Sequence, residues 1–263
     1  MDFSVLKQRG ENVLKHRRIL WDLSLSQLKA KFAGLKLGFW WVLVVPLALA
    51  FCINFVFVLA FKVDTPHYTF FILSGLIPWF FISQAVSESA GAFLANKNML
   101  RQGIFPREFI PLSSVLANFL NFFFGFLFIL PLYFLTNRTL IFFLPSLSLV
   151  VFFTLVFALG LGLIFAALNT FFRDTAYFLS IGLMFWFWIT PVFYSETMLD
   201  FPYRWVSLLN PATYFVSAFR KVLYYADPVG IVDMGLLFLI SALTLLIGYF
   251  YYLKNEPEIL KKI

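Results

Sequence analysis

Long apolar runs dominate the chain from residue 39 onward, and short polar segments separate them. A helix needs about 20 mostly apolar residues to cross a bilayer, and backbone pairing in lipid favours helices over open strands. The alternation typical of a membrane barrel is absent. Six runs are long enough: Phe39–Phe61, Tyr68–Ser87, Phe109–Thr136, Leu140–Phe172, Thr175–Ser195 and Met234–Leu253. The pattern predicts an all-α integral membrane protein with six transmembrane helices over residues 39–253.

The segment before the first span, residues 1–38, has a different pattern. Apolar residues recur there at spacings of three and four, which places them on one face of a helix. They are Trp21, Leu25, Leu28, Phe32 and Leu35. Lysines flank this stripe and are candidates for binding lipid headgroups: Lys29, Lys31 and Lys36. We expect an amphipathic helix in the membrane interface, or alternatively a cytoplasmic helix packed on protein. Trp40 and Trp41 would then lie at headgroup level.

The loop between spans two and three, Ala92–Glu108, predicts a short cytoplasmic helix. Asn96 is a candidate N-cap, Gly103 a stop, and Pro106 prevents continuation. The helix would carry Lys97, Met99, Leu100 and Arg101. An ordinary loop whose charges satisfy the topology rule is the alternative.

The segment from Glu196 to Pro228 is too apolar for a free loop, yet its core, Trp205–Phe219, is too short to span. Pro211 is favourable at a helix start. We therefore expect two short re-entrant or interfacial helices that meet near Asn210.

Composition and charge agree with a membrane protein. Hydrophobic residues make up 62% of the chain and charged residues 13%, which excludes a soluble enzyme of this size. The net charge of +7 raises the question of nucleic acid. However, fifteen of the 20 Lys and Arg residues fall on one predicted side, so the charge indicates topology. The positive-inside rule places both termini, and the tail 254–263, in the cytoplasm, and no nucleic-acid partner is expected.

Catalytic chemistry is not indicated by the sequence. No ionisable residue lies at the middle of a span, and no His, Cys or carboxylate group has metal-ligand spacing. A phosphate-binding Gly-rich loop is also missing. The single cysteine, Cys52, is interpreted as a small apolar residue. We expect no catalytic residue, metal or cofactor in this chain.

Several ordered motifs together resemble one family. They extend from about residue 20 to 225 and begin with Ala30–Leu47 (AKFAGLKLGFWWVLVVPL) and Tyr68–Val86, which contains Gly75 and Pro78-Trp79. Asn96–Val115 follows, and then Phe171–Tyr194, which contains the turn Arg173-Asp174 and ends in Thr190-Pro191-Val192. The last motifs are Asn210-Pro211 and Phe219-Arg220. In this order they resemble the permease subunit of type-2 ABC exporters. The similarity is greater to the branch that exports O-antigen, teichoic acid and capsule polysaccharides.

The resemblance implies a bacterial inner-membrane homodimer that binds a separate ATP-binding cassette subunit, which would hold ATP and Mg²⁺. The helix carrying Asn96, Lys97, Met99, Leu100 and Arg101 would dock on that subunit. The dimer would enclose a canal for a lipid-linked glycan, with outer gate helices in Glu196–Pro228 and Arg173-Asp174 as a cytoplasmic turn. Aromatic residues are candidates for the canal or gate because flat rings suit the apolar faces of sugars: Trp40, Trp41, Trp79, Trp186, Tyr194, Trp205 and Tyr214.

Other functions would need different features. A permease for a small molecule or drug is the nearest alternative, and the basic N-terminal segment and the aromatic density favour a glycan over it. A secondary carrier or channel would need ionisable groups within the spans or a selectivity filter. A membrane enzyme would need paired carboxylates or a histidine near the interface.

Overall fold

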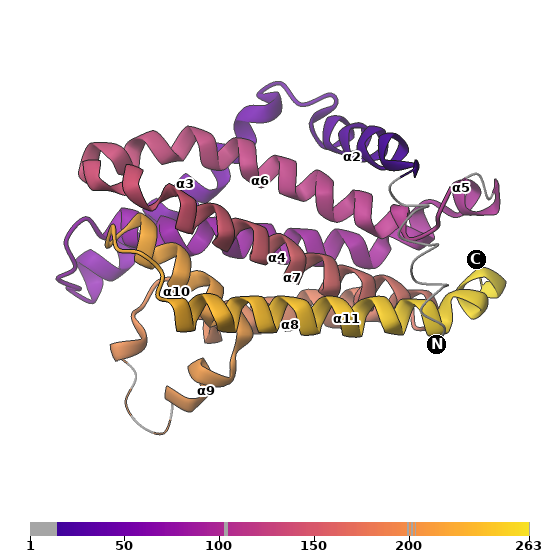
Figure 1. The fold of residues 1–263 in the computed structure, drawn as a ribbon. Coiled ribbons are helices and arrows are strands. Elements are labelled where there is room, and N and C mark those ends of the chain that lie inside the picture. Colours follow the sequence, from indigo (N-terminus) through magenta and orange to yellow (C-terminus); the bar gives the residue numbers. More distant parts are fainter. Residues whose placement is uncertain (1–14, 103–104, 199, 201, 203, 263) are drawn as a thin grey trace.

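Four long helices form the body of the molecule and run along a common axis (Figure 1). They are α4 (Tyr68–Ala95), α6 (Phe109–Thr136), α7 (Leu144–Phe171) and α11 (Ile231–Lys262). The computed structural model describes residues 15–102, 105–198, 200, 202 and 204–262. Every regular element within these residues is helical, as the apolar runs predict.

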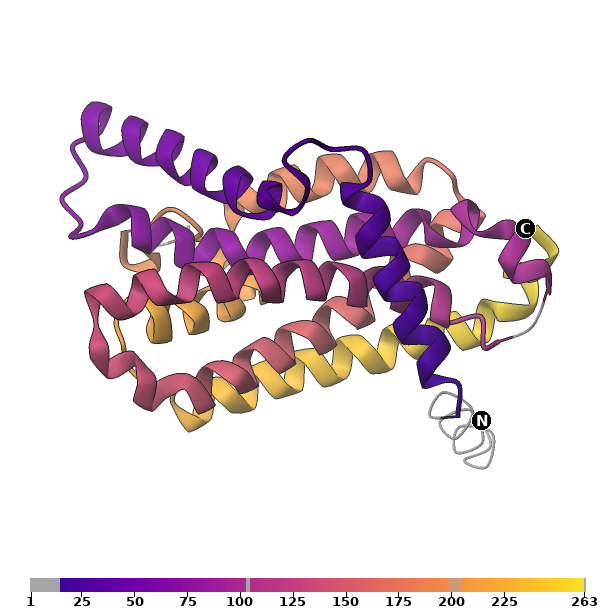
Figure 2. The ribbon, with the colours of Figure 1, turned by 90° about the horizontal axis from the view of Figure 1, so that it is seen from above.

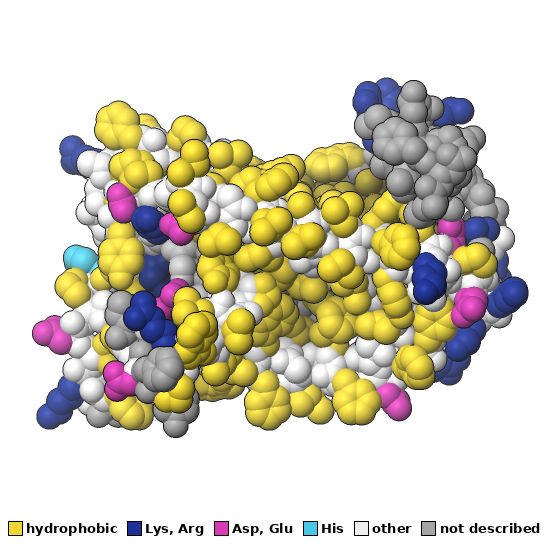
Figure 3. Space-filling model, turned by 60° about the horizontal axis from the view of Figure 1, so that its bottom comes forward, with side chains coloured by type: hydrophobic (Ala, Val, Ile, Leu, Met, Phe, Trp, Pro, Cys, Tyr) yellow, Lys and Arg dark blue, Asp and Glu magenta, His cyan; other side chains and the backbone are white. Residues whose placement is uncertain are grey.

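Five helical segments are long and apolar enough to cross a membrane: Gly38–Leu59, Tyr68–Ala95, Phe109–Thr136, Arg138–Phe171 and Ile231–Ile259. Their side chains form a broad apolar belt, and charged side chains gather at the two ends of the bundle (Figure 3). The C-terminal end of α11 and the short helix α5 (Lys97–Gln102) share one end (Figures 1 and 2). The opposite end holds α9 (Arg204–Leu209) and α10 (Pro211–Leu223).

The predicted fifth span, Thr175–Ser195, is too long. Helix α8 covers only Thr175–Ile189, and Thr190 is extended (ψ 132°) because the next residue is Pro191. Fifteen residues rise about 22 Å, less than the ~30 Å hydrocarbon core. The chain then makes one turn, η4 (Glu196–Met198), before α9.

Helix α4 lies at the centre of the bundle and is buried along most of its length. It contacts α3 (Trp41–Asn54), α6, α7, α8 and α10. The first span is more exposed: a 3₁₀ turn, η1 (Gly38–Trp40), leads into α3, and a π-helical segment, η2 (Phe55–Ala60), ends it. A second 3₁₀ turn, η3 (Arg138–Phe143), begins the fourth span, so regular α-helix starts at Leu144 and not at Leu140.

Helices α7 and α11 make the most extensive contact in the fold. Two glycines face each other there, since a Cβ placed on Gly248 would collide with the backbone of Gly160. A Cβ on Gly160 would lie 2.5 Å from the carbonyl carbon of Thr244. Small residues let the two backbones touch, which is a common basis of helix association in membranes.

Helix α2 (Arg17–Phe32) crosses α6 obliquely (Figure 2). Leu25, Leu28 and Phe32 of the predicted stripe pack against α6. Trp21 and Leu35 are exposed, and Leu35 follows the end of the helix. The middle of the stripe therefore packs on protein, and the position of α2 in the membrane interface stays a prediction.

Candidate functional site

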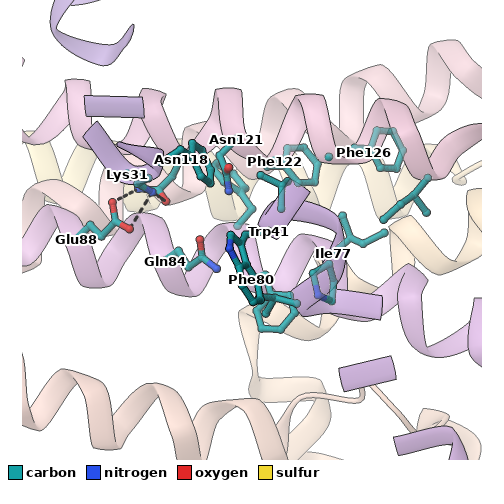
Figure 4. Close-up of a pocket in the computed structure, with 17 residues that line it drawn as sticks. Lys31, Trp41, Ile77, Phe80, Gln84, Glu88, Asn118, Asn121, Phe122 and Phe126 are labelled. Atoms are coloured by element: carbon teal, nitrogen blue, oxygen red, sulfur yellow. Dashed lines mark hydrogen bonds and ion pairs between the residues drawn. The ribbon is translucent and has the colours of Figure 1, made fainter. Parts of the chain in front are cut away.

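A cavity of about 190 Å³ lies between α2, α3, α4 and α6 (Figure 4). Helices α4 and α6 each contribute a single face to it. Glu88, Gln84, Phe80 and Ile77 follow one another along α4 at helical spacing. On α6 the same face carries Asn118, Asn121, Phe122, Gly125, Phe126 and Ile129. Polar side chains thus line one end of the cavity and apolar side chains the other.

Three helices are linked at the polar end. The Nζ atom of Lys31 on α2 lies 2.8 Å from Oε1 of Glu88 and donates to Oδ1 of Asn118 at 2.6 Å. Nδ2 of Asn118 donates to Oε2 of Glu88 at 2.9 Å. The expectation that Lys31 extends to lipid headgroups is wrong in this structure, because the amine is held by protein groups. Lys29 and Lys36 are exposed, and for them the headgroup role stays a prediction.

Two amide side chains follow this linked group toward the apolar end. Gln84 and Asn121 lie between Glu88 and the rings of Phe80 and Phe122 (Figure 4). The Oδ1 atom of Asn121 is buried and has no hydrogen-bond partner among the described residues. A buried amide oxygen without a partner costs free energy, so Oδ1 of Asn121 is a candidate acceptor for a donor from water or from a bound molecule.

The half of the bundle nearer α9 and α10 contains an aromatic cluster that includes three predicted canal residues. The rings of Trp79 and Trp186 meet edge-on, with centroids 5.6 Å apart. Nε1 of Trp186 donates to Oδ1 of Asn210 at 2.6 Å, which fixes α8 to the junction of α9 and α10. Phe187 and Phe193 continue the cluster to Tyr194.

Tyr194 lies outside the helices, and its hydroxyl donates to the carbonyl of Ile189 at 2.8 Å.

The remaining predicted aromatic residues lie elsewhere. Trp40 and Trp41 are exposed at the start of α3, and Trp41 lines the cavity. Trp205 is exposed on α9. The hydroxyl of Tyr214 donates to the carbonyl of Leu208, which links α10 to α9. The seven candidates therefore do not form one surface within a single subunit.

Arg220 on α10 belongs to the Phe219-Arg220 motif of the family resemblance, but its burial was not predicted from the sequence. The charge count placed it on the outer side, but it is only 4% exposed. Its Nη2 atom donates to the carbonyl of Val192 at 2.6 Å, and its guanidinium lies 3.9 Å from the ring centroid of Phe71. Its position at the end of the predicted short helices of Glu196–Pro228 gave no sign of this burial.

Helix α5 forms as predicted and begins at Lys97, directly after Asn96. Nδ2 of Asn96 donates to the carbonyl of Ala92 at the end of α4, and the backbone carbonyl of Asn96 accepts from the amide of Leu100 in α5. Met99 and Leu100 pack into a cluster with residues of α4, α7 and α11. Lys97 is partly exposed and Arg101 is exposed. The predicted stop, Gly103, lies outside the described residues.

The turn Arg173-Asp174 is exposed between α7 and α8. Phe171, just before it, packs in the same cluster as Met99 and Leu100. This turn and α5 are therefore close to the same surface of the bundle. Within the described residues, no group of three or more His, Cys, Asp or Glu side chains has the arrangement of a metal site.

Comparison with known proteins gives consistent matches. Residues 20–224 match the family described as ABC-2 type transporter. The O-antigen export system permease protein RfbA of Klebsiella pneumoniae is 32% identical over 203 residues, which cover 75% of this chain and 76% of the relative. The protein of the same name from Myxococcus xanthus is 30% identical over 212 residues, with coverages of 80% and 82%. The polysialic acid transport protein KpsM of Escherichia coli is 26% identical over 246 residues, with coverages of 90% and 93%.

Proposed function

Because this chain belongs to the ABC-2 type transporter family, we propose that it is the membrane-spanning subunit of an ATP-driven polysaccharide exporter. The observation that carries the proposal is the similarity to O-antigen export permeases across three quarters of both chains. The substrate is a lipid-linked polysaccharide that crosses the bacterial inner membrane from the cytoplasm. The chain supplies the path, and a separate ATP-binding cassette subunit with ATP and Mg²⁺ supplies the energy.

Helix α5 is the proposed docking element for the ATPase. Leu100 is 3% exposed and, with Met99, anchors α5 to the ends of three long helices. Lys97 and Arg101 face outward from this anchored base. A short helix fixed by apolar contacts and presenting basic side chains can transmit a movement of the partner to the bundle. The exposed turn Arg173-Asp174 adds to the same cytoplasmic surface.

A second copy of the chain is the proposed partner within the membrane. Helix α8 is too short to span by itself and exposes large apolar residues along one side: Tyr177, Phe178, Ile181, Phe185 and Trp188. Helix α3 is similarly uncovered. In a homodimer these faces would enclose the path, with six spans per subunit when α8 and residues 190–195 together complete the crossing. Both termini are then cytoplasmic.

The outer aromatic cluster suits a sliding glycan. Trp79 and Trp186 are held by packing and by the hydrogen bond to Asn210, so the rings are fixed. Rings bind the apolar faces of many sugars without strong point contacts, and a conducted substrate must be able to leave each site. Helices α9 and α10 form the outer gate, and Lys29 and Lys36 attract the phosphate groups of the lipid-linked end.

The test measures export of a surface glycan in a bacterial strain from which this chain has been deleted. Restored surface glycan on expression of this chain with its ATPase subunit, but not with an ATPase that cannot hydrolyse ATP, is the expected result. Purification of the complex should yield both subunits. Surface glycan that is independent of this chain, together with a purified complex lacking an ATPase, would refute the proposal.

A further inference from the structure

The cavity beside α3 changes from polar to apolar along its length in the same direction on two helices. On α4 the order is Glu88, Gln84, Phe80 and Ile77, and on α6 polar Asn118 and Asn121 precede the apolar residues from Phe122 to Ile129 (Figure 4). Eleven residues separate the two ends on each helix, which corresponds to roughly 16 Å. A surface with this gradient matches the shape of a lipid, which has a polar head and an apolar chain.

The depth of the cavity matches the inner leaflet. Helix α4 begins at Tyr68, its outer end, and Glu88 lies 20 residues further along the helix, which corresponds to a rise of about 30 Å. This distance equals the thickness of the hydrocarbon core, so the polar end lies at its cytoplasmic boundary. The apolar end extends from there toward the middle of the membrane.

The cavity also opens at the surface of the subunit beside α3. Trp41 and Val45 of α3 line it and are 40% and 45% exposed. On the other side, Val42 packs directly against Gly125 of α6, where any Cβ would collide with it. Helix α3 therefore closes one side of the cavity where Val42 meets Gly125, and leaves an opening at Trp41 and Val45.

The polar side chains at the polar end of the cavity determine which chemical type of lipid head can bind there. Lys31 and Glu88 neutralise each other, so neither an anionic nor a cationic head gains a free counter-charge. The Oδ1 atom of Asn121 is buried and needs a donor. Amide groups donate and accept, and hydroxyl groups do the same, so a hydroxylated head satisfies both Asn121 and Gln84.

We infer that this cavity binds one membrane amphiphile, with an uncharged hydroxyl-bearing head beside Gln84 and Asn121 and its hydrocarbon chain along Phe80, Phe122 and Phe126. The proposed site lies beside the contact of α3 with Gly125. Its lining contains no nucleotide-binding group, so its occupancy does not depend on ATP. The two natural sources of such a molecule are a glycerol-headed or glycosyl bilayer lipid and the sugar next to the lipid carrier of an exported glycan.

The test uses the full-length chain in phosphatidylcholine vesicles and two photoreactive probes. Both are dodecyl chains with a diazirine, one with a glucose head and one with a phosphocholine head that has no hydroxyl group. We expect the glucoside to label Trp41, Phe80, Phe122 or Phe126, and the phosphocholine probe to label them much less. Equal labelling by both probes would overturn the head assignment, and labelling spread evenly over the belt would overturn the site.

Two variants and a matched control separate the head contact from the fold. Asn121→Leu removes the amide, and the glucoside labelling should fall by roughly fivefold to tenfold, as expected for the loss of one or two hydrogen bonds. Asn54→Leu makes the same change on α3 outside the cavity and should leave labelling unchanged. If Asn121→Leu does not fold, Val45→Trp, which fills the opening, should reduce labelling by both probes. Unchanged labelling in a folded Asn121→Leu or Val45→Trp protein contradicts the inference.

Competition identifies the source of the amphiphile. Excess diacylglycerol, whose uncharged head has a hydroxyl group, should displace the glucoside if a bilayer lipid occupies the cavity. A lipid-linked oligosaccharide should displace it if the exported molecule does. Displacement by neither would refute the site. Labelling requires no ATPase and no export, so a failure here leaves the exporter proposal standing, and a failure of export leaves this result unaffected.

Discussion

The guanidinium of Arg220 donates to the carbonyl oxygen of Val192 at 2.6 Å, so α10 holds the irregular backbone that follows α8. A second donor of Arg220 reaches the carbonyl of Tyr194 at 3.3 Å. Non-helical backbone at membrane depth is stable only where protein or water satisfies its polar groups. Arg220 supplies those hydrogen bonds at the point where Pro191 ends the helix.

Replacing Arg220 by Met should lower the stability of the protein by about 2–4 kcal/mol, because two buried carbonyl groups lose their donor. Thermal unfolding of the purified chain in detergent measures the effect. Lys221→Met is the control on the same helix, because the Lys221 ion pair with Asp233 is solvent-accessible and contributes about 1 kcal/mol or less. Equal unfolding temperatures for the two variants would show that the Arg220 contacts are unimportant.

Gly75→Ala should be destabilising by about 1–3 kcal/mol, since overpacking of a tight contact has this cost. A Cβ at Gly75 would lie 2.7 Å from the carbonyl oxygen of Val192 and 3.0 Å from Nη2 of Arg220. Gly91→Ala, on the same helix, meets no atom within 4 Å and should be neutral or stabilising. The comparison of the two unfolding temperatures tests the contact, and a Gly75→Ala protein as stable as Gly91→Ala contradicts it.

Glu88→Lys should release α2 from the bundle by placing two amines together at the polar end of the cavity. Hydrogen exchange of the backbone in residues 17–32 should become about tenfold faster, which corresponds to a loss of about 1.4 kcal/mol of local stability. Adding Lys31→Glu should restore slow exchange, because the charges are exchanged and not removed. Lys29→Glu is the control with an exposed lysine. Rapid exchange in the double variant would argue against the ion pair as the link.

The double variant Lys97→Glu, Arg101→Glu should abolish co-purification with the ATPase subunit and reduce export at least tenfold. The fold should be retained, because Met99 and Leu100 still anchor α5. Circular dichroism and the unfolding temperature report on the fold, and pull-down and surface glycan report on function. Lys261→Glu with Lys262→Glu provides a charge-matched control in the tail. Normal export by the α5 variant would refute the docking role.

The sequence predicted the long helices well because each one carries its own signal. The helix Phe109–Thr136 begins and ends at the predicted residues, because polar residues and turn signals flank the apolar run on both sides. The two short helices meeting at Asn210 were also predictable. Oδ1 of Asn210 accepts from the amide of Ala212, and Pro211 occupies the first helical position.

Features that depend on two distant segments were not predictable from one chain. The pairing of Lys31 with Glu88 joins residues 57 positions apart, and nothing near Lys31 distinguishes it from Lys29. The burial of Arg220 depends on the close approach of Phe71 and Gly75. The end of α8 was locally encoded by Pro191, but the continuing apolar residues Val192 and Phe193 gave the opposite indication.

The glycine contact between Gly160 and Gly248 has a consequence for synthesis in the cell. Helix α7 acquires its most extensive neighbour only when α11 has been made, and residues 172–230 lie between them. At about 5–20 residues per second, the 91 residues from 172 to the end of α11 at Lys262 take on the order of 5–18 s to translate. During that interval the glycine-containing face of α7 is covered by lipid or by the insertion machinery. Truncation before Ile231 would leave this face of α7 permanently without its partner.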